Sequence, residues 1–132
     1  RRNKMGRYYN GDLNGKWWFG VQSSTTPEKF GAEPIYSFIE YTICNNDDFT
    51  DAMDELKKGL GDKIKILDEF FDKQIAYSND DLLEYVKKTH SEYTNSELDN
   101  DLSHYADYKF GLDVAKHFKE SGEDYCSISS EL

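Results

Sequence analysis

The sequence predicts a single α+β domain, in which about three helices cover one face of a small, mostly antiparallel sheet of three or four strands. Three observations predict it. The chain of 132 residues has the length of one ordinary domain. Strand-forming residues dominate the β part, residues 6–44, whereas apolar residues spaced by three and four dominate the helical part, residues 47–121. Residues 124–130 alternate in polarity like a terminal strand, and residues 1–5 are expected to be disordered or left from expression.

The β part is expected to begin with a hairpin. Asn10-Gly11 and Asn14-Gly15 separate Arg7-Tyr8-Tyr9 from the strand-like segment Lys16–Gln22, and Asn-Gly favours the positive-φ turns that match strand twist. A loop over residues 23–33 follows.

Residues 34–44 form the strongest predicted strand, because β-branched and aromatic residues dominate them. Side chains alternate between the two faces of a sheet. The better core face is predicted to hold the following residues: Trp17, Phe19, Val21, Ile35, Ile39, Tyr41 and Ile43.

The helical part begins with an apolar stripe from Phe49 to Phe71, which Asn46 or Asp47 can cap and which Gly59 and Gly61 can kink. A short helix is predicted after Ser78. A third helix is predicted from Thr94, where Glu97 completes a capping box, to Ser121-Gly122. Its predicted apolar stripe is Leu98, Leu102, Tyr105, Tyr108, Leu112 and Ala115.

The second face of the sheet supplies the candidate binding residues, since helices from one segment readily cover only one face. These residues are Trp18, Gln22, Tyr36, Phe38, Glu40 and Tyr125. Three interpretations stay open. A loop or the N-terminal segment covers the rings, the face forms a homodimer interface, or the rings bind a flat ligand of nucleotide type.

The formal net charge of −10 argues against direct binding to a nucleic-acid backbone. Residues 1–46 carry +2, whereas residues 47–132 carry 22 acidic against 10 basic side chains. The leading functional prediction is therefore a non-enzymatic protein that inhibits a partner with a basic surface by imitating DNA phosphates; a solvated face that aids solubility is the plainer alternative. The candidate acidic residues are Asp47, Asp51, Asp54, Glu55, Asp68, Glu69 and Asp72.

No catalytic residue, metal or cofactor is predicted, because no nucleophile, phosphate-loop or metal-ligand motif occurs. The three histidines are expected at the surface. Asp12 begins a segment like a calcium loop, but Ser23 stands where the bidentate glutamate belongs. Cys44 and Cys126 are predicted to be reduced thiols. Without a visible signal peptide or an apolar run that spans a membrane, the chain is expected in the cytoplasm.

Three segments carry a resemblance. The opening GRYYNGDLNGKWWFGVQSS (residues 6–24), residues 104–111 and residues 126–132 are similar to a group of small uncharacterised proteins from phage and environmental sequences. The resemblance implies a compact viral or phage accessory protein, which would act in the host cytoplasm, and it implies no activity. Met5 would then be the natural start, with residues 1–4 added for expression.

Overall fold

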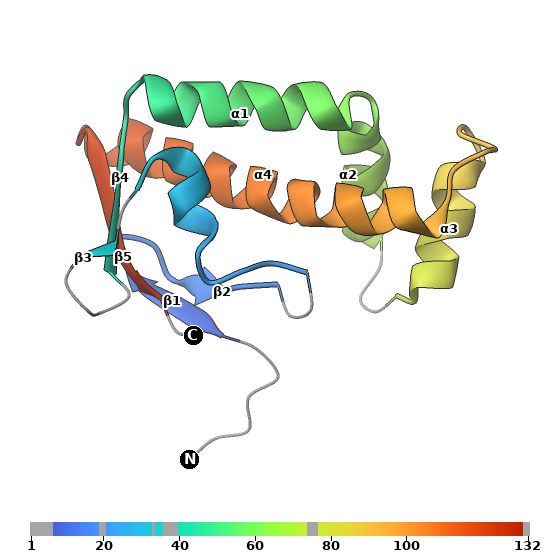
Figure 1. Cartoon of the computed structure of the whole chain (residues 1–132), viewed down its shortest axis with the longest axis horizontal. Coiled ribbons are helices and arrows are strands. Elements are labelled where there is room, and N and C mark those ends of the chain that lie inside the picture. The colour runs from blue at the N-terminus through green and yellow to red at the C-terminus, as the bar shows by residue number, and fades with distance from the viewer. Residues whose placement is uncertain (1–6, 19–20, 33, 36–39, 74–76, 131–132) are drawn as a thin grey trace, which may run out of the picture.

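The computed structural model describes residues 7–18, 21–32, 34–35, 40–73 and 77–130, and it confirms the α+β class (Figure 1). Its sheet has the strand order β2-β1-β5-β4-β3, and all four neighbouring pairs are antiparallel. The strands in chain order are β1 (Tyr8–Gly11), β2 (Gly15–Lys16), β3 (Pro34–Ile35), β4 (Glu40–Cys44) and β5 (Tyr125–Ser130). The terminal strand β5 therefore returns to the middle of the sheet, as the sequence predicts.

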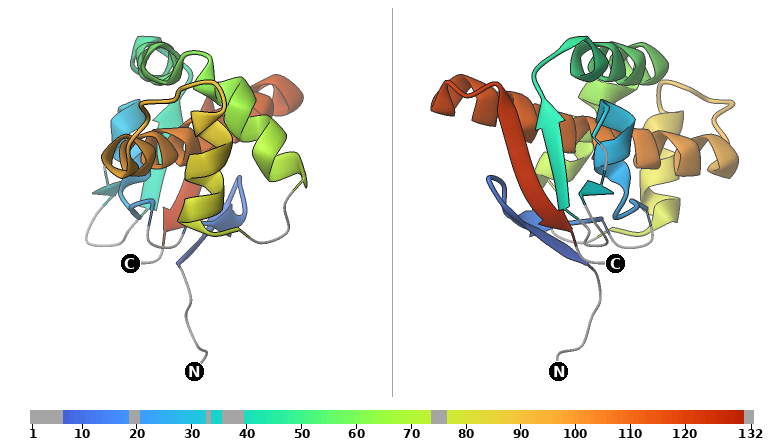
Figure 2. Two further views of the ribbon diagram at one scale, coloured as in Figure 1. Left: turned by 90° about the vertical axis from the view of Figure 1, so that its right-hand side faces the viewer. Right: turned by 60° about the vertical axis from the view of Figure 1, so that its left-hand side comes forward.

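The longest helix, α4, runs along the molecule from the sheet at one end to α3 at the other (Figures 1 and 2). The helical segments are the 3-10 helix η1 (Thr26–Phe30), α1 (Asp47–Leu60), α2 (Lys63–Lys73), α3 (Asn79–Lys87) and α4 (Asn95–Ser121). The helix α1 lies alongside α4, whereas α2 and α3 lie at the end of the molecule that is farther from the sheet (Figure 1). In the part of the chain that the structure describes, no helix combines the length and apolarity needed to cross a bilayer.

The predicted helix starts are confirmed by their caps. The side chain of Asn46 accepts a hydrogen bond from the backbone N–H of Phe49, and that of Ser78 accepts one from Asp81. Thr94 and Glu97 form the reciprocal capping box at the start of α4. Each cap satisfies backbone donors that a helix leaves free in its first turn.

The long strand predicted over residues 34–44 is divided into two shorter strands. Residues 34–44 do not form one strand, because β3 and β4 pair antiparallel with Ile35 opposite Glu40. The two strands are therefore separate elements, and residues 36–39 between them lie outside the described residues. Along β4 the alternation is confirmed, since Tyr41 and Ile43 are buried and Cys44 is exposed.

The predicted single stripe from Phe49 to Phe71 is divided between two helices. Gly61 lies at the break with φ 58° and ψ −132°, a backbone conformation that favours glycine. Its N–H still bonds the carbonyl of Lys57, so α1 ends in an ordinary terminal turn before α2 begins at Lys63. The kink predicted from the two glycines is therefore a complete break.

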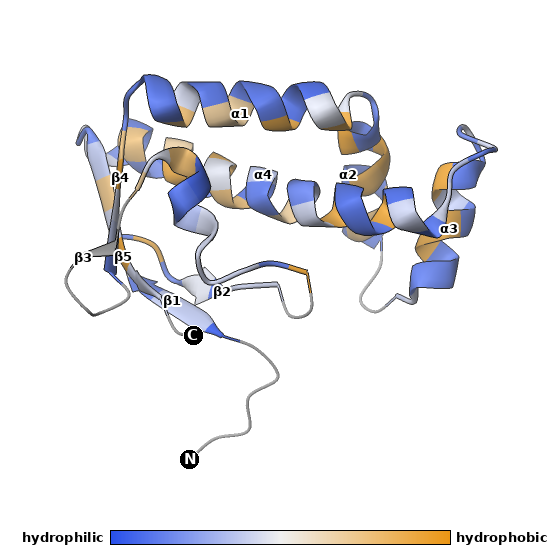
Figure 3. Cartoon of the chain, viewed as in Figure 1, coloured by the Kyte–Doolittle hydropathy of each residue, from blue (hydrophilic) through white to orange (hydrophobic). Residues whose placement is uncertain are grey.

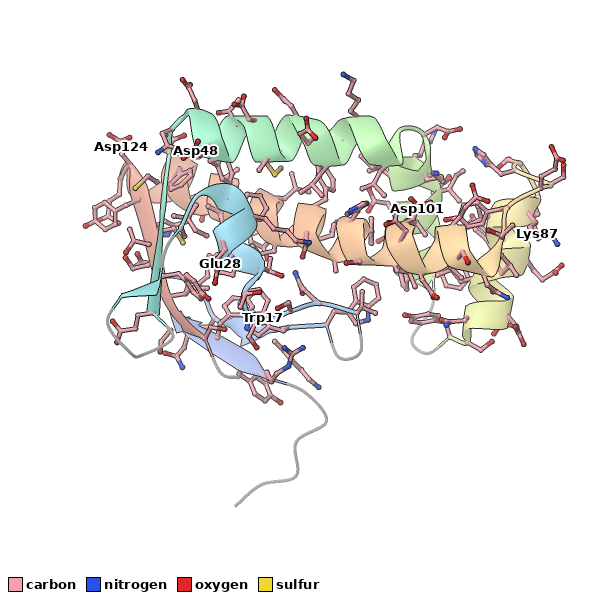
Figure 4. All side chains as sticks on the ribbon, viewed as in Figure 1. Trp17, Glu28, Asp48, Lys87, Asp101 and Asp124 are labelled. Atoms are coloured by element: carbon pink, nitrogen blue, oxygen red, sulfur yellow. The ribbon has the colours of Figure 1, made fainter. Side chains whose placement is uncertain are left out.

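Two hydrophobic clusters follow one another along α4. The sheet cluster joins the sheet, η1 and α1 to the C-terminal half of α4, and it contains the fully buried Trp17 (Figure 4). The distal cluster joins α2 and α3 to the N-terminal half of α4. Hydrophilic residues cover the outer side of α1 (Figure 3). The helices α2 and α3 thus pack on α4 and not on the sheet.

The helix α4 is buried on more than one side, which corrects its predicted stripe. Leu112 was expected in the core but is exposed, whereas Phe110, Val114 and Phe118 are buried. Gly111 allows the close approach of α1, because a Cβ atom there would collide with the sulfur of Met53. A helix surrounded in this way has no single apolar face for a periodicity to reveal.

Candidate ligand-binding site

The outer face of the sheet, in the described residues, carries polar side chains together with the exposed ring of Tyr125. Glu40 and Tyr125, two of the predicted binding residues, do lie on it and are exposed. Between them the hydroxyls of Thr42 and Ser127 share a hydrogen bond of 2.9 Å. A shallow hollow of about 220 Å³ lies over this face. Tyr36 and Phe38, also predicted for this face, fall outside the described residues.

Trp18 and Gln22 do not lie on the outer face, which corrects their predicted position. The strand β2 ends at Lys16, and the chain turns so that the N–H groups of Val21 and Gln22 both bond the carbonyl of Trp18. The side-chain carbonyl of Gln22 accepts from the N–H of Trp18 at 3.1 Å, which closes the turn. Trp18 consequently leaves the sheet and packs edge-on against Phe71 of α2.

These two residues instead line a pocket that has a volume of about 430 Å³ and lies between the β2 segment and α4. Most of its wall is aromatic or aliphatic, a composition typical of ligand pockets. Its lining residues are Tyr9, Lys16, Trp17, Trp18, Gln22, Ala106, Lys109, Phe110 and Asp113.

Two lysines and one aspartate are the charged residues that line this pocket. The Lys16 ammonium lies 5.8 Å from the centre of the Tyr8 ring, and the Lys109 ammonium lies 3.4 Å from Asp68 Oδ1. Lys16 and Lys109 are both exposed, and Asp113 lies one helical turn beyond Lys109 on α4. Partial burial raises the pKa of Asp113, although Lys109 and Lys116 oppose the shift. Burial, followed by the electrostatic effects of Asp113 and Cys126, raises the pKa of Tyr9 to about 12. The pocket therefore combines a largely apolar wall with two lysines and one aspartate, and one of the lysines already has a carboxylate neighbour.

A buried carboxylate holds one residue of the pocket wall in position. Asp107, 1% exposed, accepts hydrogen bonds of 3.0 Å from the Gln22 amide and the Thr26 hydroxyl, and it forms an ion pair with Lys29. Arg7 adds hydrogen bonds to the Ser24 hydroxyl and to the Gln22 carbonyl. The turn that carries Trp18 is thus tied to α4 by satisfied polar groups, which orient the pocket before any ligand arrives.

The predicted acidic surface is divided. On α1, Asp47, Asp51, Asp54 and Glu55 are exposed, and none of them forms an ion pair with another described residue. Figure 4 shows side chains projecting from the outer side of this helix.

The acidic residues of α2 behave differently. Asp68 accepts a hydrogen bond from the Tyr105 hydroxyl and lies 3.4 Å from the Lys109 ammonium, so it holds two helices together. Glu69 and Asp72 are exposed. The continuous part of the predicted surface is therefore on α1.

One group in the described residues offers ligand atoms for a metal ion. Oxygen, nitrogen and sulfur atoms of Asp12, His117 and Cys126 lie within 4.8 Å of one another. The sequence showed only an incomplete calcium-loop pattern at Asp12 and a surface position for His117, because no spacing motif links residues more than 100 positions apart. The same holds for the pocket: Lys109 and Asp113 share a helix face, but nothing local pairs them with Trp18.

Cys44 and Cys126 are both free. They lie on neighbouring strands, but Cys126 pairs with Ile43 and points into the core, whereas Cys44 points outward. Their opposite directions exclude a disulfide in this fold.

No family model, curated protein or solved structure matches the chain. The phage or viral origin that the sequence resemblance implies therefore stays a prediction, and the function must be argued from the residues.

Proposed function

We propose that the chain is a non-enzymatic binding protein that holds a small, flat, anionic ligand of nucleotide type in the pocket beside Trp18. The observation that carries this proposal is the pocket itself: about 430 Å³ of space with an indole wall and lysines at its edge. Any nucleobase can stack on an aromatic side chain, because every base has a flat π-face. Phosphate or carboxylate groups suit the two lysines, of which Lys109 would exchange its contact with Asp68 for the ligand.

The charged residues at the pocket favour an anionic ligand, although the net charge of the whole chain is negative. The net charge is −10, yet two of the three charged residues that line the pocket are lysines. Coulomb attraction at a few ångströms outweighs distant exposed carboxylates, whose fields are screened beyond about 8–10 Å at physiological salt. A single nucleotide is therefore compatible with this protein, whereas a long nucleic-acid backbone would meet the acidic helices.

A thermal-shift screen of nucleotides and their nucleosides, with a chelator present, tests the proposal. A ligand at 100 times its Kd adds about 2.7 kcal/mol to the stability of the folded state. We expect stabilisation by at least one nucleotide and weaker stabilisation by its nucleoside. If no member of the panel raises the Tm, the proposal is wrong.

Point variants locate the binding site. Trp18→Ala should weaken binding by about 5- to 150-fold, the loss of 1–3 kcal/mol expected from one stacked base. Lys16→Glu should weaken a nucleotide more than its nucleoside. Lys65→Glu on α2, exposed and outside the pocket, makes the same charge change and should leave affinity within about twofold. Equal effects of the two lysine variants would place the ligand elsewhere.

A second candidate function rests on α1, where four exposed carboxylates lie free of ion pairs within the described residues. Such a helix could occupy the DNA-binding surface of a basic protein. The test is competition with duplex DNA for a linker histone at low and high salt. Neutralising Asp47, Asp51 and Asp54 to Asn should abolish competition, whereas Asp80→Asn with Asp81→Asn on α3 should not. Competition that is indifferent to salt would contradict charge mimicry.

A further inference from the structure

We propose that Asp12, His117 and Cys126 form a zinc-binding site, with Glu123 as the fourth ligand. This site lies at the sheet end of the molecule, where the turn after β1, the last turn of α4 and the strand β5 meet. None of its ligands lines the pocket beside Trp18, although Asp113 borders both hollows. The site adds a metal to a protein for which the sequence predicts none.

The imidazole of His117 faces the centre of this group. Its Nε2 atom is buried and has no hydrogen-bond partner in the described structure. The nearest acidic atoms are Glu123 Oε1 at 3.4 Å and Asp12 Oδ2 at 3.8 Å, which are too long or too poorly aligned for hydrogen bonds. A buried polar atom without a partner requires an explanation, and a bound cation supplies one.

The Asp12 carboxylate is held in position by the backbone of β5. Its Oδ2 accepts a hydrogen bond of 2.7 Å from the N–H of Ser127, and its own N–H donates to the Ser127 carbonyl at 2.8 Å. Gly11 permits this approach, because it has φ 131° and a Cβ atom there would lie 2.6 Å from the Ser127 carbonyl oxygen. Second hydrogen bonds of this kind orient ligands in known metal sites.

The Glu123 carboxylate is oriented in the same way. Its Oε2 accepts a hydrogen bond of 3.0 Å from the Tyr125 hydroxyl, which leaves Oε1 facing His117. Cys126 brings its sulfur from the core side, since its side chain is fully buried. The ligand atoms of Asp12, His117 and Cys126 thus lie close together, and Glu123 faces His117 from the edge of this group, so it would have to move inward to complete the site.

The donor set indicates which metal fits. One sulfur, one imidazole nitrogen and carboxylate oxygens are the ligands of zinc, whereas calcium and magnesium take oxygen ligands. Around tetrahedral zinc, bonds of about 2.0–2.3 Å place neighbouring ligand atoms about 3.3–3.8 Å apart. The three ligand atoms lie within 4.8 Å of one another, so a contraction of about 1 Å would close the site.

A route from solvent reaches the site. A hollow of about 350 Å³ is lined by Asp12 and His117 together with Asp113, Lys116 and Glu120. Three of these five side chains are carboxylates, which favour the entry of a cation over that of an anion. An entry path is one of the features that a real metal site requires.

The test uses the full chain after removal of metal with a chelator. Titration with Co²⁺ should saturate at one equivalent and produce the intense visible bands of a tetrahedral ion with a near-ultraviolet band from thiolate-to-cobalt charge transfer. Zn²⁺ should displace Co²⁺ and raise the Tm. Co²⁺ binding that lacks the thiolate band, or no binding at all, would overturn the proposal.

Variants assign the ligands. Cys126→Ser should remove the thiolate band, and His117→Gln and Asp12→Asn should each weaken Zn²⁺ binding by about 100-fold or more. Cys44→Ser and His104→Ala change a cysteine and a histidine outside the cluster, so they should leave the spectrum unchanged. If Cys126→Ser fails to fold, His117→Gln and Asp12→Asn decide the question through affinity. Loss of the band in Cys44→Ser instead would contradict the assignment.

Discussion

Trp17 and Trp18 are neighbours in sequence but belong to different hydrophobic clusters. Trp17 is fully buried, packs in tilted ring contacts against Tyr9 and Phe110, and donates from its indole N–H to the Ser130 hydroxyl at 2.7 Å. Trp17→Ala should therefore destabilise the fold by about 3–5 kcal/mol. Trp18 is only partly buried, so Trp18→Ala should cost about 1–2 kcal/mol. Urea midpoints of the two variants in the reverse order would contradict these positions.

The buried carboxylate of Asp107 allows a second test at the scale of one residue. Asp107→Ala removes the acceptor for two buried donors, on Gln22 and Thr26, and should cost about 2–4 kcal/mol. Asp99→Ala, an exposed position on the same helix, should change stability by less than about 0.5 kcal/mol. Chemical denaturation measures both. Similar midpoints for the two variants would show that the Asp107 contacts contribute little.

The break between α1 and α2 provides a matched pair of glycines at the scale of an element. Gly59 lies inside α1 with open space around its Cβ position, so Gly59→Ala should stabilise the protein by about 1 kcal/mol. Gly61 also has open space, but its φ of 58° strains any other residue, so Gly61→Ala should destabilise it by about 1 kcal/mol. Thermal unfolding gives both signs. Two shifts of Tm in the same direction would contradict the positions of Gly59 inside α1 and of Gly61 at the break.

Local signals predicted the elements well where the decisive groups were close in sequence. The capping box of Thr94 and Glu97, the strand alternation of Tyr41 and Ile43 and the hairpin of β1 and β2 depend on neighbours within a few residues. The first Asn-Gly pair was predicted to be the turn itself, but it lies at the end of β1 and pairs with β5. The end of β2 depends on Gln22, whose amide is held by Asp107, 85 positions away. No local pattern encodes that contact, which is why the predicted strand ran on to Gln22.

The candidate sites were harder to predict for the same reason. The sequence singled out Trp18 and Gln22, which do line the main pocket, but it placed them on the wrong side of the sheet. The partners Lys109 and Asp113 come from α4, and only the packing of α4 on the sheet brings them there. The sequence could therefore indicate the residues that the β2 segment contributes to the pocket. The residues that α4 contributes could be identified only from the tertiary structure.

At the scale of the whole molecule, several tyrosines couple stability to alkaline pH. Burial, together with a hydrogen bond to Glu28, raises the pKa of Tyr41 to about 12 from 10.0, and burial likewise raises the pKa values of Tyr93 and Tyr105, which bond Asp101 and Asp68. Because each folded pKa exceeds the unfolded one, the stabilisation is complete below about pH 10 and is lost as pH rises above it.

We therefore expect the urea midpoint to fall steeply above about pH 10. Tyr93→Phe removes one coupled phenol and should make the fall shallower. Spectrophotometric titration should show that some of the ten tyrosines ionise only as the protein unfolds. A midpoint that stays constant up to about pH 11 would contradict the coupling.

The two clusters raise the question of whether the molecule unfolds in one step. The helix α4 belongs to both, and Tyr108 at its middle packs against each. Opening the distal cluster would leave half of α4 without the packing that stabilises a helix in water. The Asp107 contacts also link the turn of Trp18 to this helix. The clusters should consequently unfold together.

Single-tryptophan variants measure this directly, because each remaining indole reports one cluster. Trp18→Phe leaves Trp17 in the sheet cluster, and Trp17→Phe leaves Trp18 beside the distal cluster. Within each variant, the fluorescence transition in urea should coincide with the loss of helix measured by circular dichroism. The midpoint of Trp17→Phe should be lower overall, since the substitution lies in the core. A fluorescence change in Trp17→Phe that precedes the loss of most helix would instead show that the α2–α3 end opens independently, with α4 surviving on the sheet alone.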